Sequence, residues 1–180
     1  ILANMFCVAL LWVYSTNFKK SLLFGNIVIS ILVAWTILII FFSKLSVADA
    51  VGMGEGAHYK FFRLAFLYAG FAFIATLIRE AIKDIEDMPG DLKYGCRTMP
   101  IVWGVNAAKI YIAVWLIVLI AILIVVQVYV LQFRWWLPVL YSIALIIAPL
   151  VFIFSKLFRA VTTADFHQLS NWIKLVMLTG

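Results

Sequence analysis

The stretch Ile110–Phe133, IYIAVWLIVLIAILIVVQVYVLQF, carries no charged side chain over 24 residues. A transmembrane helix needs about 20 apolar residues to cross roughly 30 Å of hydrocarbon, so this stretch is long enough to span a bilayer. The whole 180-residue chain has the same character, since 67% of its residues are hydrophobic and only 12% are charged. Ordinary soluble domains contain about 25% charged residues. This composition excludes a soluble globular domain, a disordered region and a disulfide scaffold.

Charged residues mark the ends of the apolar stretches. They divide the chain into five full candidate spans and the start of a sixth, at residues 1–18, 21–43, 59–82, 100–133, 135–155 and 166–180. The stretches are long and do not alternate between apolar and polar residues, which favours helices over barrel strands. We therefore predict an all-α fold, a multi-span transmembrane helix bundle that forms one domain. A glycine-rich loop is predicted at 49–58 and a charged loop at 83–98.

Basic residues are unevenly distributed over the predicted loops. If alternate loops share a side, nine of them fall on one side, namely Lys19, Lys20, Arg79, Lys83, Lys93, Arg97, Lys109, Lys156 and Arg159. The other side has four, namely Lys44, Lys60, Arg63 and Arg134. The positive-inside rule assigns the side with nine to the cytoplasm. Topology and anionic lipid thus account for most of the net charge of +6 without a nucleic acid partner.

Five of the eight acidic residues fall between positions 80 and 91. On a helix, Glu80, Asp84 and Asp87 lie within an arc of about 60°. Pro89 is expected to end that helix near Asp87, because the residue before a proline disfavours helical angles. A turn at the following glycine would then bring Asp91 back toward Asp87.

Carboxylates gathered so closely repel one another unless they are solvated or neutralised by a cation. Several oxygen ligands without a nearby His or Cys favour Mg²⁺, which usually completes its coordination with water and substrate phosphates. Lys93 and Arg97 follow directly and suit a phosphate group. A solvated loop with local ion pairs explains the spacing of these residues equally well.

The segment Arg79–Ile101, REAIKDIEDMPGDLKYGCRTMPI, resembles the second aspartate-rich motif of the UbiA superfamily of intramembrane prenyltransferases. It is most similar to the branch of the (di)geranylgeranylglyceryl-phosphate synthases. A second resemblance lies at Tyr14–Asn26, which is similar to the family's Tyr-Ser-x-x-x-Lys-Arg-x-x-x-x-Gly-Asn loop. Lys20 stands where the family has Arg, so the planar, bidentate fork is absent at that position.

Family members have nine membrane helices, and their first aspartate motif, Asn-x-x-x-Asp-x-x-x-Asp, does not occur in this chain. The resemblance implies that the chain supplies the fourth to the eighth helices and part of the ninth, and lacks the first three. We therefore expect residues 1–180 alone to be inactive, because half of the metal site lies upstream.

The resemblance implies an enzyme that moves a prenyl group from its diphosphate to a lipid-soluble acceptor within the membrane, with Mg²⁺ as cofactor. By resemblance, Asp87 and Asp91 are catalytic metal ligands, and Asp84 is a further ligand. The residues expected to meet the diphosphate are Lys19, Lys20, Lys93, Arg97 and Tyr14. Additional candidates for the site are Arg79, Glu80, Lys83 and Asn26.

Three alternatives remain at this point. The acceptor is expected to resemble geranylgeranylglycerol phosphate, but an aromatic acid or quinone precursor, of the 4-hydroxybenzoate or menaquinone type, fits the same family. A transporter would also be a helix bundle, although it is expected to place ionisable residues within its spans. A structural membrane subunit would not need the acidic cluster.

The topology predicts that the loops near Lys19, Asp87 and Arg159 share one membrane side, and that Asp49 and Arg134 lie on the other. In the full-length protein, single cysteines at the positions of Lys19, Asp87 and Arg159 should react with an impermeant reagent added on one side of the membrane. Single cysteines at the positions of Asp49 and Arg134 should react with the reagent added on the other side. Labelling of the Asp87 and Asp49 positions from the same side would refute the predicted topology.

Overall fold

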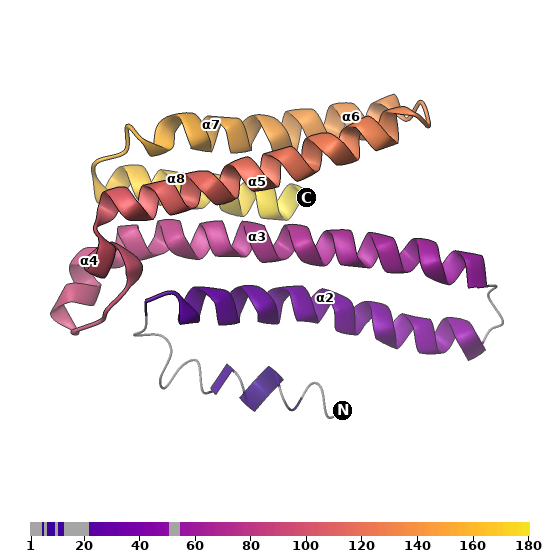
Figure 1. The fold of residues 1–180 in the computed structure, drawn as a ribbon, viewed down its shortest axis with the longest axis horizontal. Helices are drawn as coiled ribbons and strands as arrows, with labels where there is room; N and C mark the ends of the chain where they lie inside the picture. Colours follow the sequence, from indigo (N-terminus) through magenta and orange to yellow (C-terminus); the bar gives the residue numbers. More distant parts are fainter. Residues whose placement is uncertain (1–4, 6, 10, 13–21, 51–54) are drawn as a thin grey trace. The chain divides into compact units, whose positions relative to one another are not determined.

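The computed structural model describes residues 5, 7–9, 11, 12, 22–50 and 55–180, with side chains described outside 43–60. The described residues are mainly helical and include no strand. The elements in chain order are α2 (Phe24–Ala50), α3 (Glu55–Lys93), α4 (Met99–Trp103), α5 (Val105–Leu131), α6 (Trp136–Ser142), the π-helical turn η2 (Ile143–Ile147), α7 (Ala148–Leu157) and α8 (Thr163–Thr179) (Figure 1).

Within the described residues, four helical segments are long and apolar enough to cross a membrane, namely Phe24–Phe42, Phe61–Lys93, Val105–Leu131 and Trp136–Leu157. They fall on the predicted spans 21–43, 59–82, 100–133 and 135–155. Elements α6, η2 and α7 together form the last of them, and α8 occupies the predicted final stretch. The prediction of an all-α membrane fold is confirmed. Most of the predicted span 1–18 lies outside the described residues.

Large apolar side chains remain exposed along these helices. Val125 is 69% exposed and Leu137 is 81% exposed. In water so much apolar surface would drive association, whereas in a bilayer it contacts acyl chains. The exposed surface therefore agrees with the composition, and both indicate a protein that is solvated by lipid.

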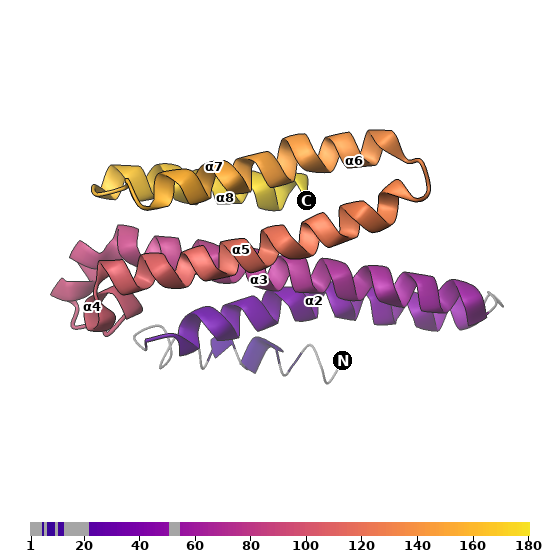
Figure 2. The same ribbon diagram turned by 45° about the horizontal axis from the view of Figure 1, so that its top comes forward.

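The chain divides into two compact units, one of residues Ile1–Lys19 and Phe24–Leu77 and the other of Lys20–Leu23 and Ile78–Gly180. In the first unit, α2 lies beside the N-terminal part of α3, with the rings of Phe41 and Phe62 6.0 Å apart (Figures 1 and 2). In the second unit, α7 lies along α8 (Figure 2). The interior of this unit includes the fully buried residues Ile78, Ile82, Ile112, Leu116, Ile153, Leu157 and Ile173.

The prediction that Pro89 ends its helix is wrong. Helix α3 continues through Pro89 to Lys93, so most of the predicted loop 83–98 is helical. A proline inside a helix removes one backbone hydrogen bond and clashes with the carbonyl four residues earlier. Here Pro89 lies in the last turns of a 39-residue helix, where little helix remains to be displaced. The predicted loop 49–58 is shortened in the same way, because α2 reaches Ala50 and α3 begins at Glu55.

Gly95 provides the signal that ends α3. Its φ is +65°, a left-handed conformation that glycine adopts without a Cβ penalty. The Cys96 N–H donates to the Asp91 carbonyl at 3.0 Å, and the Gly95 N–H donates to the Leu92 carbonyl at 3.3 Å. These two bonds define a Schellman motif, which satisfies carbonyls that a helix end leaves without partners.

Pro149 interrupts the helical rod of α6, η2 and α7. It cannot donate to the carbonyl of Leu145, four residues earlier. The Thr179 hydroxyl lies 3.2 Å from that carbonyl and 3.0 Å from the carbonyl of Leu175, so its proton can serve either one. The wide turn η2 and this hydroxyl together accommodate the proline within a membrane segment.

The role of Gly95 can be tested against Gly90, which lies inside α3. A Cβ at either position would meet no atom within 4 Å, so the two sites differ in backbone conformation. Gly95→Ala should lower the free energy of unfolding by about 1 kcal/mol, because a left-handed L-residue is strained. Gly90→Ala should raise it by about 0.5 kcal/mol. Thermal unfolding of the purified protein in detergent measures both, and equal effects would refute the assignment of the helix end.

Candidate active site

Four carboxylates lie along one face of α3, within the second unit. Glu80, Asp84, Asp87 and Asp91 occupy positions i, i+4, i+7 and i+11, which places them within an arc of about 60° on a helix. We call this set the acidic face. Asp91 joins it through the continued helix, and the predicted return turn at Gly90 does not form.

The side chains of the acidic face differ in exposure. Glu80 is buried, Asp84 and Asp91 are half-buried, and Asp87 is exposed. The face therefore passes from the packed interior at Glu80 to solvent-accessible carboxylates nearer the end of α3. A ligand that approaches from that end would meet Asp87 before it meets Glu80.

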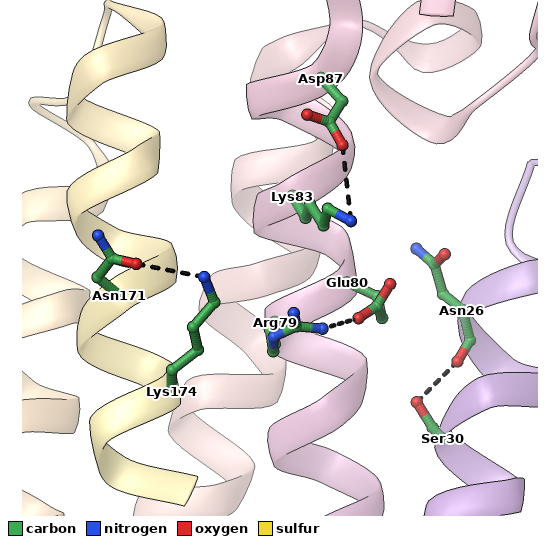
Figure 3. Close-up of polar contacts among 8 residues, drawn as sticks. All are labelled: Asn26, Ser30, Arg79, Glu80, Lys83, Asp87, Asn171 and Lys174. Carbon is green, nitrogen blue, oxygen red and sulfur yellow. Dashed lines mark hydrogen bonds and ion pairs between the residues drawn. The ribbon is translucent and has the colours of Figure 1, made fainter.

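Two basic residues on α3 pair with members of the acidic face. The Arg79 guanidinium forms an ion pair with Glu80, and Lys83 Nζ lies 3.9 Å from Asp87 Oδ2 (Figure 3). The side chains of Lys83 and Asp87 are 48% and 52% exposed, and exposed pairs of this kind contribute about 0–1 kcal/mol. Asp87 can therefore exchange its lysine partner for a ligand at little cost.

Asp84 lies near one residue of helix α5. Its carboxylate is within electrostatic range of the Tyr111 hydroxyl, and the Tyr111 ring lies 6.3 Å from that of Trp115. Tyr111 could not be predicted from the sequence as a residue near the site, because its place near Asp84 depends on the tertiary packing of α5. An aromatic hydroxyl near a half-buried carboxylate adds a hydrogen-bond donor to this end of the site.

The acidic face suits Mg²⁺ better than a metal that needs an all-protein cage. Across the described part of the chain, no three His, Cys, Asp or Glu residues come together as a metal site. Mg²⁺ is commonly held by one or two carboxylates, with waters and substrate phosphates as its other ligands. Neighbouring carboxylates on consecutive turns, such as Asp84 with Asp87 or Asp87 with Asp91, provide that donor set.

Lys93 ends α3, and Arg97 follows the Gly95 turn. Both side chains are exposed, so both cations are accessible near the end of the acidic face. Asn26 belongs to α2 in the first unit, where its carbonyl accepts a 2.7 Å hydrogen bond from Ser30 Oγ. The predicted diphosphate ligands Tyr14, Lys19 and Lys20 lie outside the described residues.

A contact between α3 and α8 lies on the side of α3 that points away from the acidic face. His167 Nδ1 lies 2.6 Å from Glu86 Oε1, and Glu86 points away from the arc of the four carboxylates. Neither residue was predicted from the sequence to belong to the site. Their pairing depends on the packing of two helices that are 81 residues apart, which no local pattern reveals.

Lys109 was counted from the sequence among the basic residues of the predicted loops, and the structure shows that its side chain is buried at the start of α5. It is 8% exposed, and its Nζ donates to the Ala160 carbonyl at 2.6 Å. The same Nζ lies 5.6 Å from the centre of the Phe166 ring. Lys109 thus joins the start of α5 to the connection between α7 and α8, and both the hydrogen bond and the cation–π contact compensate its burial.

The long apolar helices, with a carboxylate face at the end of one of them, define a helical membrane protein with an acidic candidate site. The UbiA prenyltransferase family model matches residues 1–175. The chain therefore belongs to the UbiA prenyltransferase family.

Several curated relatives carry the name digeranylgeranylglyceryl phosphate synthase. That of Methanosphaera stadtmanae is 31% identical over 174 residues, which cover 96% of this chain and 57% of the relative. That of Methanothrix thermoacetophila is 30% identical over 98% of this chain and 59% of the relative. The protein of Methanospirillum hungatei is 38% identical over 58% of this chain and 32% of its own length. The chain thus spans less than two thirds of these relatives, and no solved structure matches it.

The buried position of Lys109 predicts a structural role. Lys109→Met keeps the apolar length of the side chain but leaves the Ala160 carbonyl without its donor, which should cost about 1–3 kcal/mol of stability. Lys174→Met is the matched control, because Lys174 is exposed and its Nζ donates to Asn171 Oδ1 on the same helix at 3.2 Å (Figure 3). Thermal unfolding in detergent should separate the two variants, and equal stability would contradict the buried role.

Proposed function

We propose that the full-length protein transfers a prenyl group from a prenyl diphosphate to a lipid acceptor of the glycerol-phosphate type, in a reaction that depends on Mg²⁺. The observation that carries this proposal is the acidic face on the last turns of α3, which remain helical through Pro89. The exposed cations Lys93 and Arg97 lie near its end. Membership of the UbiA prenyltransferase family supports the type of reaction. The names of the curated relatives support the glycerol-phosphate acceptor.

The chemical difficulty of this reaction is the charge of the leaving diphosphate. As the carbon–oxygen bond breaks, negative charge grows on the diphosphate and the allylic carbon becomes cationic. We assign Asp84, Asp87 and Asp91 as the residues that would hold Mg²⁺, in neighbouring pairs of Asp84 with Asp87 or Asp87 with Asp91, because the three do not come together as one site. When bound there, the ion supplies Lewis-acid stabilisation of the leaving oxygen.

The basic residues near the acidic face have a separate role in the proposed mechanism. Lys93 and Arg97 donate hydrogen bonds to diphosphate oxygens, together with Lys19, Lys20 and Tyr14 from the preceding segment. Charge-assisted hydrogen bonds of this kind strengthen as charge develops on the oxygens. Arg79 keeps Glu80 neutralised, and Lys83 is released from Asp87 when that carboxylate takes a ligand. Asn26 is a further candidate for contact with the substrate.

The surroundings of the site also fit the proposed substrates. A prenyl chain is apolar and partitions among membrane helices, whereas its diphosphate needs water-accessible charge. Helix α3 combines the two requirements, because its apolar span leads directly into the acidic face. We propose that this chain forms part of a nine-helix bundle, with the site on the cytoplasmic side as the distribution of basic residues predicts.

Asp87→Asn and Asp91→Asn in the full-length protein test the metal assignment. Each replaces an anionic ligand by a neutral amide of the same size, and each should lower prenyl transfer by roughly a hundredfold or more. Each should also raise the Mg²⁺ concentration needed for half-maximal activity. Asp49→Asn is the matched control, because Asp49 lies in α2 and outside the acidic face.

Thermal unfolding should show that the two variants remain folded, because Asp87 is exposed and Asp91 is half-buried. Wild-type activity in both variants would refute the assignment. Unfolding of both would indicate a structural role for the two carboxylates.

A further inference from the structure

A second polar site lies in the second unit, where α7 ends and α8 begins. It is a pocket of about 240 Å³, and its lining includes Phe152, Lys156, Arg159, Asp165, Gln168 and Trp172. We call it the α7–α8 pocket. None of these residues belongs to the acidic face or to the segment that resembles the aspartate-rich motif.

The residues that line the pocket carry more positive than negative charge. Asp165 is its only carboxylate among the described lining residues, and it is engaged in capping α8. Its Oδ2 accepts the N–H of Thr162 at 2.9 Å and the N–H of Val161 at 3.0 Å. These hydrogen bonds, with that from Thr162 the stronger influence, hold the pKa of Asp165 below its usual range. Asp165 therefore stays ionised, and the lining carries two cations, Lys156 and Arg159, against this one carboxylate.

An aromatic wall lies beside these cations. The rings of Phe152 and Trp172 are 5.2 Å apart, and Lys156 Nζ lies 5.6 Å from the centre of the Phe152 ring. A second hollow of about 210 Å³ shares Gln168 and Trp172 with the pocket and continues along α8 to Leu175. Charge at one end and apolar surface at the other match the two parts of a lipid, and tryptophan is typical of the membrane interface.

The pocket is separate from the candidate active site. His167 contacts Glu86 on the side of α3 that points away from the acidic face, so it marks the side of α8 that packs against α3. At 100° per residue, Gln168 and Trp172 lie about 100° and about 140° around α8 from His167. The pocket therefore opens on a different side of α8 from the side that packs against α3.

We propose that the α7–α8 pocket binds an anionic membrane phospholipid, with its phosphate between Lys156 and Arg159 and its acyl chain along Trp172 and Leu175. Basic pockets between membrane helices bind phosphate head groups in this way. The phosphate accepts charge-assisted hydrogen bonds from the two basic side chains. The hollow along α8 removes part of the acyl chain from contact with other lipids. A neutral or zwitterionic head group would not compensate the two cations.

Native mass spectrometry of the purified full-length protein, titrated with phosphatidylglycerol or phosphatidylcholine in detergent, tests this proposal. Phosphatidylglycerol should bind more tightly to the wild-type protein, which requires no mutation. Lys156→Gln and Arg159→Gln should each weaken its retention about fivefold, the effect of about 1 kcal/mol per basic residue near a membrane surface. Lys156→Arg, which keeps the charge, should retain the lipid.

Arg134→Gln is the matched control, because it removes one exposed cation at the turn between α5 and α6, outside the pocket. It should leave retention unchanged. Equal retention of the two lipids by the wild-type protein, or an equal loss in the Arg134 variant, would overturn the proposal. Displacement of phosphatidylglycerol by millimolar inorganic phosphate would also overturn it, because the pocket would then take free phosphate. The readout is the mass of bound lipid, so its result is independent of prenyl transfer.

Discussion

A helix is stable in the hydrocarbon region of a bilayer only if its backbone N–H and C=O groups hydrogen-bond to one another and its charged side chains lie near its ends. Helix α3 follows this constraint, because an apolar span leads into a polar segment that begins at Arg79. The helical repeat then determines which carboxylates share a face. Because the backbone remains helical beyond Pro89, Asp91 stays aligned with Asp84 and Asp87. The chemistry of the site therefore depends on an unbroken helix.

The positions of the long helices could be predicted from the sequence, because an uncharged run of more than 20 residues has few alternatives in a bilayer. The end of α3 could not be predicted from Pro89 alone. A proline lowers the stability of a helix locally, whereas the packing of Ile78 and Ile82 in the second unit stabilises the helix as a whole. Gly95 was the better signal, since a left-handed turn is available to glycine at no steric cost.

The candidate site was predictable to the extent that it lies on one helix. The spacing of Glu80, Asp84 and Asp87 already indicated a shared face. Contacts between helices were not predictable, because they depend on which faces pack together. Lys109 illustrates the difference, since a basic residue at the start of a span is usually a solvated topological signal, whereas here a carbonyl 51 residues away holds it in the interior. The α7–α8 pocket could not be predicted for the same reason, because its lining comes from two helices that pack together.

The length of α3 has a consequence for the membrane itself. Its 39 residues extend over roughly 58 Å at about 1.5 Å per residue, nearly twice the hydrocarbon thickness of about 30 Å. Such a helix cannot be matched to one bilayer along its whole length, so the bilayer determines which turn meets the head groups. A membrane thicker by about 3 Å would shift that boundary by about two residues, close to half a helical turn. The immersion depth of the acidic face is therefore a property shared by protein and lipid, and it can vary with membrane composition while the amino-acid sequence stays the same.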